Sequence, residues 1–215
     1  MMHVNKRLRK AAEVGSEAEL KALLRDPDCD ALAIDNKGWT ALMWAAYEGH
    51  KACVQLLLPL SDASSKDKDG KTALMLAAHL GQAACVKLLL PASNALTKDR
   101  FGRQALMWAA TYGYEGCVSV LLPASNALAK DQDGMTALML SSMQGHRACV
   151  NALLPVSDIH AKDKKGLTAC VLARERRYES LAQRIDDYAL AQSERATIDA
   201  SAYPGSPRAR TIPRM

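Results

Sequence analysis

Apolar residues recur at helical spacing in short stretches, separated at regular intervals by polar residues. Residues 66–93 read KDKDGKTALMLAAHLGQAACVKLLLPAS, with apolar stretches at 73–79 and 83–90. Apolar positions three and four residues apart indicate the buried face of a helix. Pro91 follows the second stretch and has no backbone N–H, so that helix is expected to end there. The pattern predicts two short antiparallel helices.

The polar residues around these stretches carry turn and capping signals. Asp67 and Gly70 occupy the first and fourth positions of a type I turn. Thr72 precedes the first helix, where its hydroxyl can accept a hydrogen bond from a free helical amide. Gly81 lies between the helices and can adopt the left-handed conformation that ends the first one. One unit is therefore predicted to be turn, helix, tight turn, helix.

This unit returns every 32 residues, the step from Gly38 to Gly70. Four residue types keep this register along most of the chain: Gly38, Gly70, Gly102, Gly134 and Gly166; Cys53, Cys85, Cys117 and Cys149; Pro59, Pro91, Pro123 and Pro155; Asp35, Asp67, Asp99, Asp131 and Asp163. A helix pair of this size leaves apolar faces that only neighbouring pairs can cover. The repeat predicts an all-α solenoid of stacked helix pairs.

The unit resembles the ankyrin repeat. The first internal unit carries TALMWAA at 40–46 and VQLLL at 54–58, and most later units repeat this pattern, with Gln104 in place of the threonine in one of them. The family's usual proline after the threonine is alanine here, and its histidine after the leucine is methionine or valine. The hydrogen-bonded tether that this histidine makes in the family is therefore expected to be absent.

The ends of the array have polar residues where the internal units have apolar ones. Lys10 occupies the position of Trp44, and Arg184 that of Leu56, as the outer faces of terminal repeats require. We expect an ankyrin-repeat domain over 1–190 and a flexible tail over 191–215. The expected units are a cap at about 5–34, internal units at 35–66, 67–98, 99–130 and 131–162, and a second cap at 163–190.

Composition narrows the class of protein. Hydrophobic residues make up 49% of the 215 residues and aromatic residues 5%, so the core must be mainly aliphatic. No apolar stretch is long enough to span a membrane, and no apolar run follows the basic N-terminus as in a secretory signal. Six cysteines without an export signal indicate a cytoplasmic protein with reduced thiols. The net charge of +5 is too mild to indicate a nucleic-acid partner.

The periodic cysteines could in principle serve redox chemistry or bind a metal. Stacked helices lie about 8–10 Å apart, beyond the roughly 7 Å limit between the α-carbons of a disulfide. Each unit offers at most two of the four ligands of a zinc site, so we interpret these cysteines as core residues. The sequence has no nucleophile elbow, phosphate-binding loop or metalloprotease helix. We therefore predict no catalytic residues, cofactor or metal.

The resemblance implies a concave binding surface, which ankyrin arrays form from loop tips and the exposed side of the first helices. Carried over to the variable positions here, it predicts these partner-binding residues: Asn36, Lys37, Trp39, Tyr47, Lys66, Lys68, Lys71, His79, Leu80, Arg100, Phe101, Arg103, Tyr112, Gln132, Met135, Met143, Lys164, Lys165, Leu167 and Arg174. Trp39 follows a tip glycine at a variable position, so we expect it to be exposed. With Phe101 it is a candidate anchor for the partner.

These features predict a non-catalytic protein-interaction module or scaffold that is monomeric and binds another protein. An alternative is an inhibitory or regulatory subunit of an enzyme. A third is a nucleic-acid-binding protein that uses the loop tips, which carry eleven basic and seven acidic side chains. That third reading requires binding that weakens steeply with salt. We expect neither nucleic acid nor membrane as the partner.

Overall fold

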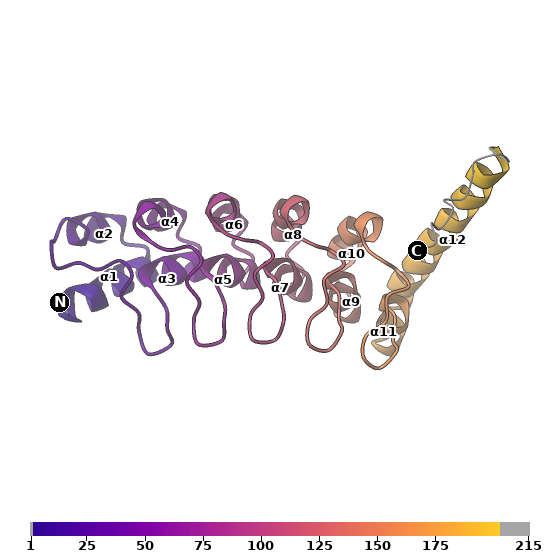
Figure 1. The fold of residues 1–215 in the computed structure, drawn as a ribbon, viewed down its shortest axis with the longest axis horizontal. Helices are drawn as coiled ribbons and strands as arrows, with labels where there is room; N and C mark the ends of the chain where they lie inside the picture. The colour runs from indigo at the N-terminus through magenta and orange to yellow at the C-terminus, as the bar shows by residue number, and fades with distance from the viewer. Residues whose placement is uncertain (1, 203–215) are drawn as a thin grey trace, which may run out of the picture.

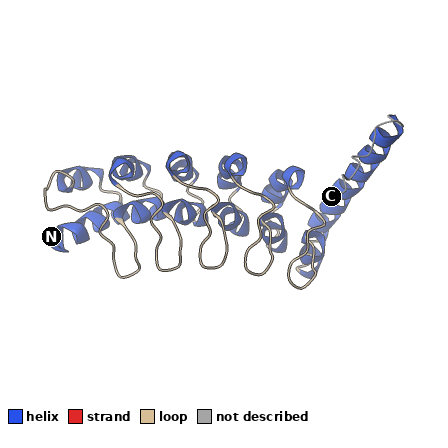
Figure 2. Ribbon diagram, viewed as in Figure 1, coloured by secondary structure: helices blue, strands red, loops and turns tan. Residues whose placement is uncertain are grey.

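The structure is a computed structural model that describes residues 2–202, and within this part of the chain the regular elements are all helices (Figures 1 and 2). Helix pairs stack side by side into an elongated array, and loops project from one row of helices (Figure 1). The predicted all-α ankyrin-type solenoid is confirmed.

The first helices of the pairs form one row. They are α1 (Met2–Val14), α3 (Ala41–Glu48), α5 (Ala73–His79), α7 (Ala105–Tyr112), α9 (Ala137–Met143) and α11 (Ala169–Glu175). The second row contains α2 (Glu17–Leu23), α4 (Lys51–Leu57), α6 (Ala83–Leu89), α8 (Glu115–Leu121) and α10 (Arg147–Leu153), and α12 (Glu179–Ala202) pairs with α11. Each first helix contacts the first helix of the next unit, so burial of apolar surface couples the units.

The predicted helix ends agree with the structure to within a residue. Thr72 accepts a hydrogen bond from the N–H of Met75 at the start of α5, and α6 ends one residue before the predicted Leu90. A proline then lies in a short 3₁₀-helix in each internal unit. These are η1 (Leu58–Leu60), η2 (Leu90–Ala92), η3 (Leu122–Ala124) and η4 (Leu154–Val156). Gln104 makes no such cap at α7, and its side-chain amide donates to the carbonyl of Leu96 at 3.1 Å.

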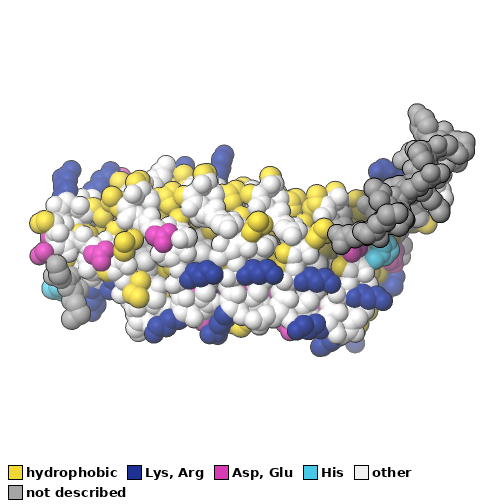
Figure 3. Space-filling model, viewed as in Figure 1, with side chains coloured by type: hydrophobic (Ala, Val, Ile, Leu, Met, Phe, Trp, Pro, Cys, Tyr) yellow, Lys and Arg dark blue, Asp and Glu magenta, His cyan; other side chains and the backbone are white. Residues whose placement is uncertain are grey.

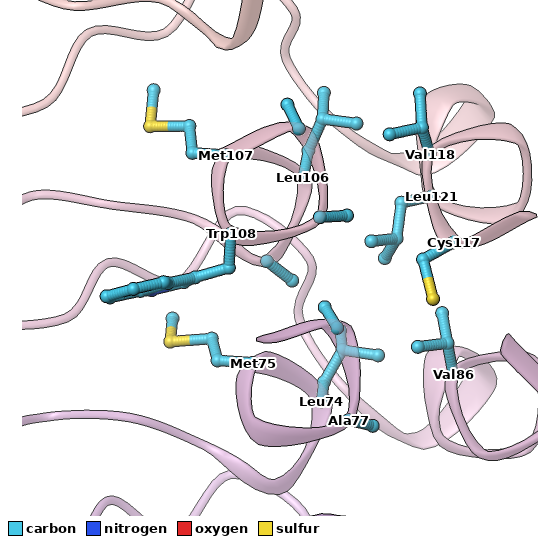
Figure 4. Packing of buried hydrophobic residues seen from close by; sticks show 14 of the residues in the cluster. Leu74, Met75, Ala77, Val86, Leu106, Met107, Trp108, Cys117, Val118 and Leu121 are labelled. Carbon is cyan, nitrogen blue, oxygen red and sulfur yellow. The ribbon is translucent and has the colours of Figure 1, made fainter. Parts of the chain in front are cut away.

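The core lies between the two rows of helices. Leu74 and Leu106 of the first row face Val86, Cys117 and Leu121 of the second row (Figure 4). The four periodic cysteines are at most 1% exposed, which confirms that they pack as small core residues. Burial raises the pKa of three of them to about 11: Cys85, Cys117 and Cys149.

One side chain at the start of each second helix packs on the preceding unit. The His50 ring lies over Gly15, and its Nε2 is 3.0 Å from the carbonyl oxygen of Glu13. His146 has the same relationship to Gly113 and to the carbonyl of Thr111. Both histidines therefore form hydrogen bonds between units.

Helix α12 extends twelve residues beyond 190, the expected end of the last unit. The sequence predicted a flexible tail from 191; the structure continues α12 through 191–202, a polar stretch that contains helix formers and neither glycine nor proline. The rest of the predicted tail, 203–215, lies outside the described residues. No helix of the described chain is both long and apolar enough to cross a membrane.

Candidate partner-binding face

The loop tips and the exposed flanks of the first helices share one surface, which we call the inner face. Two hollows lie on this face. One hollow of about 340 Å³ lies between the first two tips and is lined by Asn36, Lys37, Trp39, Lys68 and Lys71, together with acidic tip residues. Another of about 350 Å³ lies between later tips and α9 and α11. Both contain residues that the resemblance assigned to partner binding.

A tip aspartate organises each loop. In all five loops its Oδ1 accepts hydrogen bonds of 2.8–2.9 Å from the backbone N–H groups two and four residues later. Burial would raise the pKa of Asp35, but hydrogen bonds from Trp39, Trp44 and Lys37 hold that pKa below its ordinary value. Backbone hydrogen bonds of 2.9–3.2 Å also join each tip to the next. The loops therefore form one hydrogen-bonded row.

The other oxygen of the aspartate, Oδ2, accepts a side-chain N–H in the first four loops. Within a unit, Trp44 donates to Asp35 at 3.0 Å, and Trp108 donates to Asp99 at 2.9 Å. Between units, Trp39 donates to Asp67 at 3.0 Å, and Arg103 donates to Asp131 at 3.1 Å. The donor thus comes alternately from the first helix of the aspartate's own unit and from the tip of the preceding unit.

Trp39 is not the exposed anchor that the sequence predicted. Its side chain is only 9% exposed, and its ring centroid lies 4.5 Å from that of Trp44 and 4.9 Å from that of Tyr47. The ammonium group of Lys37 lies over the rings of Trp39 and Trp44 at 5.0 and 4.7 Å. The prediction failed because the residue after the tip glycine folds back onto the first helices, as the 7% exposure of Met135 also shows.

A second aromatic cluster lies on α5 and α7. The His79 ring stacks nearly parallel to Trp108 and Tyr112, at 4.8 and 4.7 Å between centroids. Burial, with a smaller contribution from Lys71, lowers the pKa of His79. Lys71 and Arg103 lie over the Trp108 ring at 4.2 and 5.2 Å, within the range of cation–π attraction. Cations over an aromatic layer thus characterise this part of the inner face.

The C-terminal part of the inner face has a hollow where the aromatic layer ends. The 350 Å³ hollow is lined by apolar residues, with charged residues beside them. The apolar members are Met135, Leu140, Met143, Leu167 and Leu172; the charged ones are Arg103, Asp133, Asp163, Lys164, Lys165, Glu175 and Arg176. Leu140 and Leu172 stand at the positions that Trp44 and Trp108 occupy in other units. The shorter side chains leave space there.

Lys66 is one of a row of lysines along the loops. Its Nζ donates to the carbonyl of Lys98, Lys98 donates to that of Lys130, and Lys130 to that of Lys162, at 2.7–3.1 Å. Figure 3 shows Lys and Arg side chains aligned across successive units on one face of the molecule. The geometry of Lys66 is therefore explained by contact with the next unit.

Several other predicted residues have partners within the chain. Arg100 pairs with Asp69 at 2.8 Å, and its guanidinium lies 4.8 Å from the ring of Phe101, which is 39% exposed. The side-chain amide of Gln132 donates to the carbonyl of Arg100. In the last units, Arg174 pairs with Asp186 of α12. Leu80 caps the C-terminus of α5 through its backbone.

Comparison with known proteins identifies the family. The description "Ankyrin repeats (3 copies)" matches residues 8–99, 52–131 and 85–164, which together cover more than half of the chain. The chain belongs to the ankyrin-repeat family. An ankyrin-repeat domain from Acinetobacter baumannii AYE has the same fold, with a TM-score of 0.75, 24% identity and coverage of 85% of this chain and 97% of that one.

A second ankyrin-type similarity involves a protein complex. The solved structure of the predatory endopeptidase Bd0816 from Bdellovibrio bacteriovorus with immunity protein Bd3460 contains a chain 28% identical to this one. The match covers 84% of this ankyrin-repeat chain and 96% of that chain, with a TM-score of 0.72. Ankyrin repeats generally mediate binding between proteins and are typically non-catalytic.

Within this ankyrin array, no three His, Cys, Asp or Glu side chains of residues 2–202 converge in a way that could hold a metal ion.

Sequence reasoning missed two groups of inner-face residues. Trp44 and Trp108 were not among the predicted partner-binding residues, although both donate to tip aspartates. The residues lining the C-terminal hollow that were missed are Asp133, Leu140, Asp163, Leu172, Glu175 and Arg176. The alternation of tryptophan and leucine in the first helices was the available signal.

Proposed function

We propose that this ankyrin-repeat protein binds a partner protein through its inner face and catalyses no reaction. The observation that carries the proposal is a preorganised surface whose two halves differ in chemistry. Lysines lie over packed aromatic rings in its N-terminal half, and an apolar hollow lies in its C-terminal half. Since the loop tips are already hydrogen-bonded to one another, binding would order few groups and lose little conformational entropy.

The charges of the inner face favour a partner with acidic side chains. Five tip lysines make no ion pair with any described residue: Lys37, Lys68, Lys71, Lys164 and Lys165. Each exposed ion pair with a partner would contribute little energy, up to about 1 kcal/mol. Their combined field would speed association and fix the orientation of the partner.

A more specific form of this function is inhibition of an enzyme. The similarity to a chain of the endopeptidase–immunity protein complex extends over nearly all of that chain and favours this form. An ankyrin array of this kind would inhibit by covering the entrance to a partner enzyme's active site. A purified partner with enzymatic activity, assayed with and without this protein, tests the idea. Unchanged enzyme activity in a saturated complex would reduce the function to scaffolding.

A charge-reversal pull-down from cell lysate tests the inner face. One variant carries Lys37→Glu, Lys68→Glu and Lys71→Glu, and a matched control carries Lys51→Glu, Lys87→Glu and Arg147→Glu, at exposed positions of the second helices. Circular dichroism first shows whether both variants are folded, and lysates are treated with nuclease. We expect the first variant to lose a specific protein that the wild type and the control retain.

Two other outcomes would contradict this proposal. Retention of the same partners by the inner-face variant would show that they bind elsewhere on the array. Capture that disappears on nuclease treatment would show that the basic tips bind nucleic acid. A steep loss of binding with added salt would accompany that second outcome.

A further inference from the structure

Asp163 breaks a rule that the other four tip aspartates follow. In those four, the Oδ2 donor stands either nine residues after the aspartate or 28 residues before it. For Asp163 these two positions hold Leu172 and Met135, neither of which has an N–H in its side chain. The described residues donate no hydrogen bond to Asp163 Oδ2, whereas Oδ1 accepts the usual bonds from Lys165 and Leu167.

The Asp163 side chain, whose Oδ2 has no donor among the described residues, lines the C-terminal hollow. Asp163 lines the 350 Å³ space together with apolar side chains that include Met135, Leu140, Met143 and Leu172. In the complete unit, Trp108 projects from α7 between Met75 and Met107 (Figure 4), and its indole N–H donates to Asp99 at 2.9 Å. The hollow thus combines apolar walls with an available hydrogen-bond acceptor. The Trp108 side chain meets the same combination, because its ring packs against apolar side chains and its N–H donates to Asp99.

We propose that this hollow is a socket for a tryptophan side chain of the partner protein, whose indole N–H donates to Asp163 Oδ2. The proposal rests on the proposed function and names the anchor that the inner face receives. A leucine or phenylalanine would bury the carboxylate without a donor, which is unfavourable. Lysine or arginine would supply a donor, but its cation would approach Lys164, Lys165 and Arg176 beside an apolar wall.

The basic residues beside the hollow also specify the neighbours of this tryptophan. Lys164 and Lys165 line the space and have no ion-pair partner among the described residues. Acidic side chains adjacent to the tryptophan would approach them. The partner segment is therefore a tryptophan flanked by aspartate or glutamate, with the indole as the buried anchor and the carboxylates outside it.

NMR titration of the full chain with N-acetyltryptophanamide tests the socket directly. We expect the amide signals of Lys165 and Leu167 and the methyl signals of Met135 and Met143 to shift. The same compound methylated at the indole nitrogen keeps the ring and loses the donor. It should bind about tenfold more weakly, as expected for loss of a hydrogen bond to a charged group. Equal binding of both compounds, or tighter binding of N-acetylargininamide, would overturn the proposal.

Two variants and a charge control separate the effect of the acceptor from the effect of the shape of the hollow. Asp163→Asn keeps an oxygen for the two backbone N–H groups and replaces Oδ2 by a donor, so N-acetyltryptophanamide should bind about tenfold more weakly. As a control, Asp28→Asn removes an equal charge from an exposed loop at the other end of the array and should bind like the wild type. Leu172→Trp places an indole at the position of Trp108 and should abolish binding by filling the socket from within.

The pull-down distinguishes failure of the socket from failure of the proposed function. If Leu172→Trp and Asp163→Asn both retain a partner that the charge-reversed inner face loses, the inner face binds the partner without this anchor. That result overturns the socket and leaves the proposed function standing. Loss of the partner in all three folded variants, together with retention by Asp28→Asn, supports both.

Discussion

Trp39 donates its indole N–H to Oδ2 of Asp67 across the boundary between the first two internal units, at 3.0 Å. Arg103 and Asp131 repeat this relationship two units later, and the Asp131 side chain is only 1% exposed. Because a buried carboxylate that loses its donor is strongly destabilised, these contacts hold neighbouring tips in register. Residues on the inner face thus serve the stability of the array as well as its surface.

Trp39→Phe should therefore lower stability, because it keeps an aromatic ring and removes the donor to Asp67. We expect a loss of about 1–3 kcal/mol in the free energy of unfolding, measured by urea denaturation. The double-mutant cycle with Asp67→Asn isolates the contact, since asparagine can keep the backbone bonds of the tip. A coupling energy near zero would show that the hydrogen bond contributes nothing.

The local features of the fold were predictable because each depends on residues close in sequence. The bounds of α5, 73–79, follow from Thr72, the apolar run and the turn that contains Gly81. The position of Trp39 was not predictable in this way. Its exposure depends on the next unit, where Asp67 accepts its N–H, and sequence variability at that position gave the wrong expectation.

The candidate site was only partly predictable, for a related reason. Tip lysines such as Lys37 and Lys71 could be proposed from the resemblance, which implies partner binding at the loop tips. The C-terminal hollow could not, since Met135 and Leu172 are ordinary apolar residues taken one at a time. They become informative only when the structure shows which donors occupy the equivalent positions in the other four loops.

Packing between loop tips predicts different effects for two equivalent glycines. Gly134 and Gly166 have φ values of 79° and 81°, so alanine at either position costs about 1–2 kcal/mol of backbone strain. A Cβ on Gly134 would lie 3.0 Å from the backbone nitrogen of Lys164, whereas a Cβ on Gly166 meets nothing within 4 Å. Gly134→Ala should therefore destabilise the array by about 1–3 kcal/mol more than Gly166→Ala. Equal losses in the free energy of unfolding, measured with urea, would show that the neighbouring tip moves aside for the Cβ without destabilising the array.

The lowered pKa of His79 predicts sensitivity of the array to acid. Above its ordinary pKa of 6.5 this imidazole is neutral in both the folded and the unfolded protein. Its contribution to stability is present there and is lost as pH falls through the lower pKa of the folded state. His79→Phe keeps a ring beside Trp108 and Tyr112 and removes this titration. Between about pH 7 and pH 5, we expect the variant to lose less stability than the wild type.

The control for this experiment is His160→Gln, which also removes one histidine but lies at an exposed position. Urea unfolding of the three proteins at each pH gives the comparison. If His79→Phe and His160→Gln both follow the wild-type pH dependence, the half-buried imidazole next to Lys71 is not the source of acid sensitivity.

The cysteines predict a two-phase reaction with a thiol reagent. Cys29 is partly exposed, whereas the other five cysteines are buried. For Cys85, Cys117 and Cys149, a pKa of about 11 leaves only about one thousandth of each thiol as reactive thiolate at pH 8. We expect one thiol to react rapidly in the folded protein and five to react only as the array opens.

The identity of the rapid thiol is checked with Cys29→Ala, which should remove the fast phase and leave the slow one. Urea should speed the slow phase in proportion to the population of opened units, because protection depends on the stacked helices.

Cys170 tests the C-terminal cap in the same experiment. Its thiol donates to Asp186 of α12 at 3.0 Å, and burial raises its pKa to about 11. Rapid labelling of Cys170 would show that α12 separates readily from α11, and slow labelling in step with Cys117 would show that the cap opens together with the array.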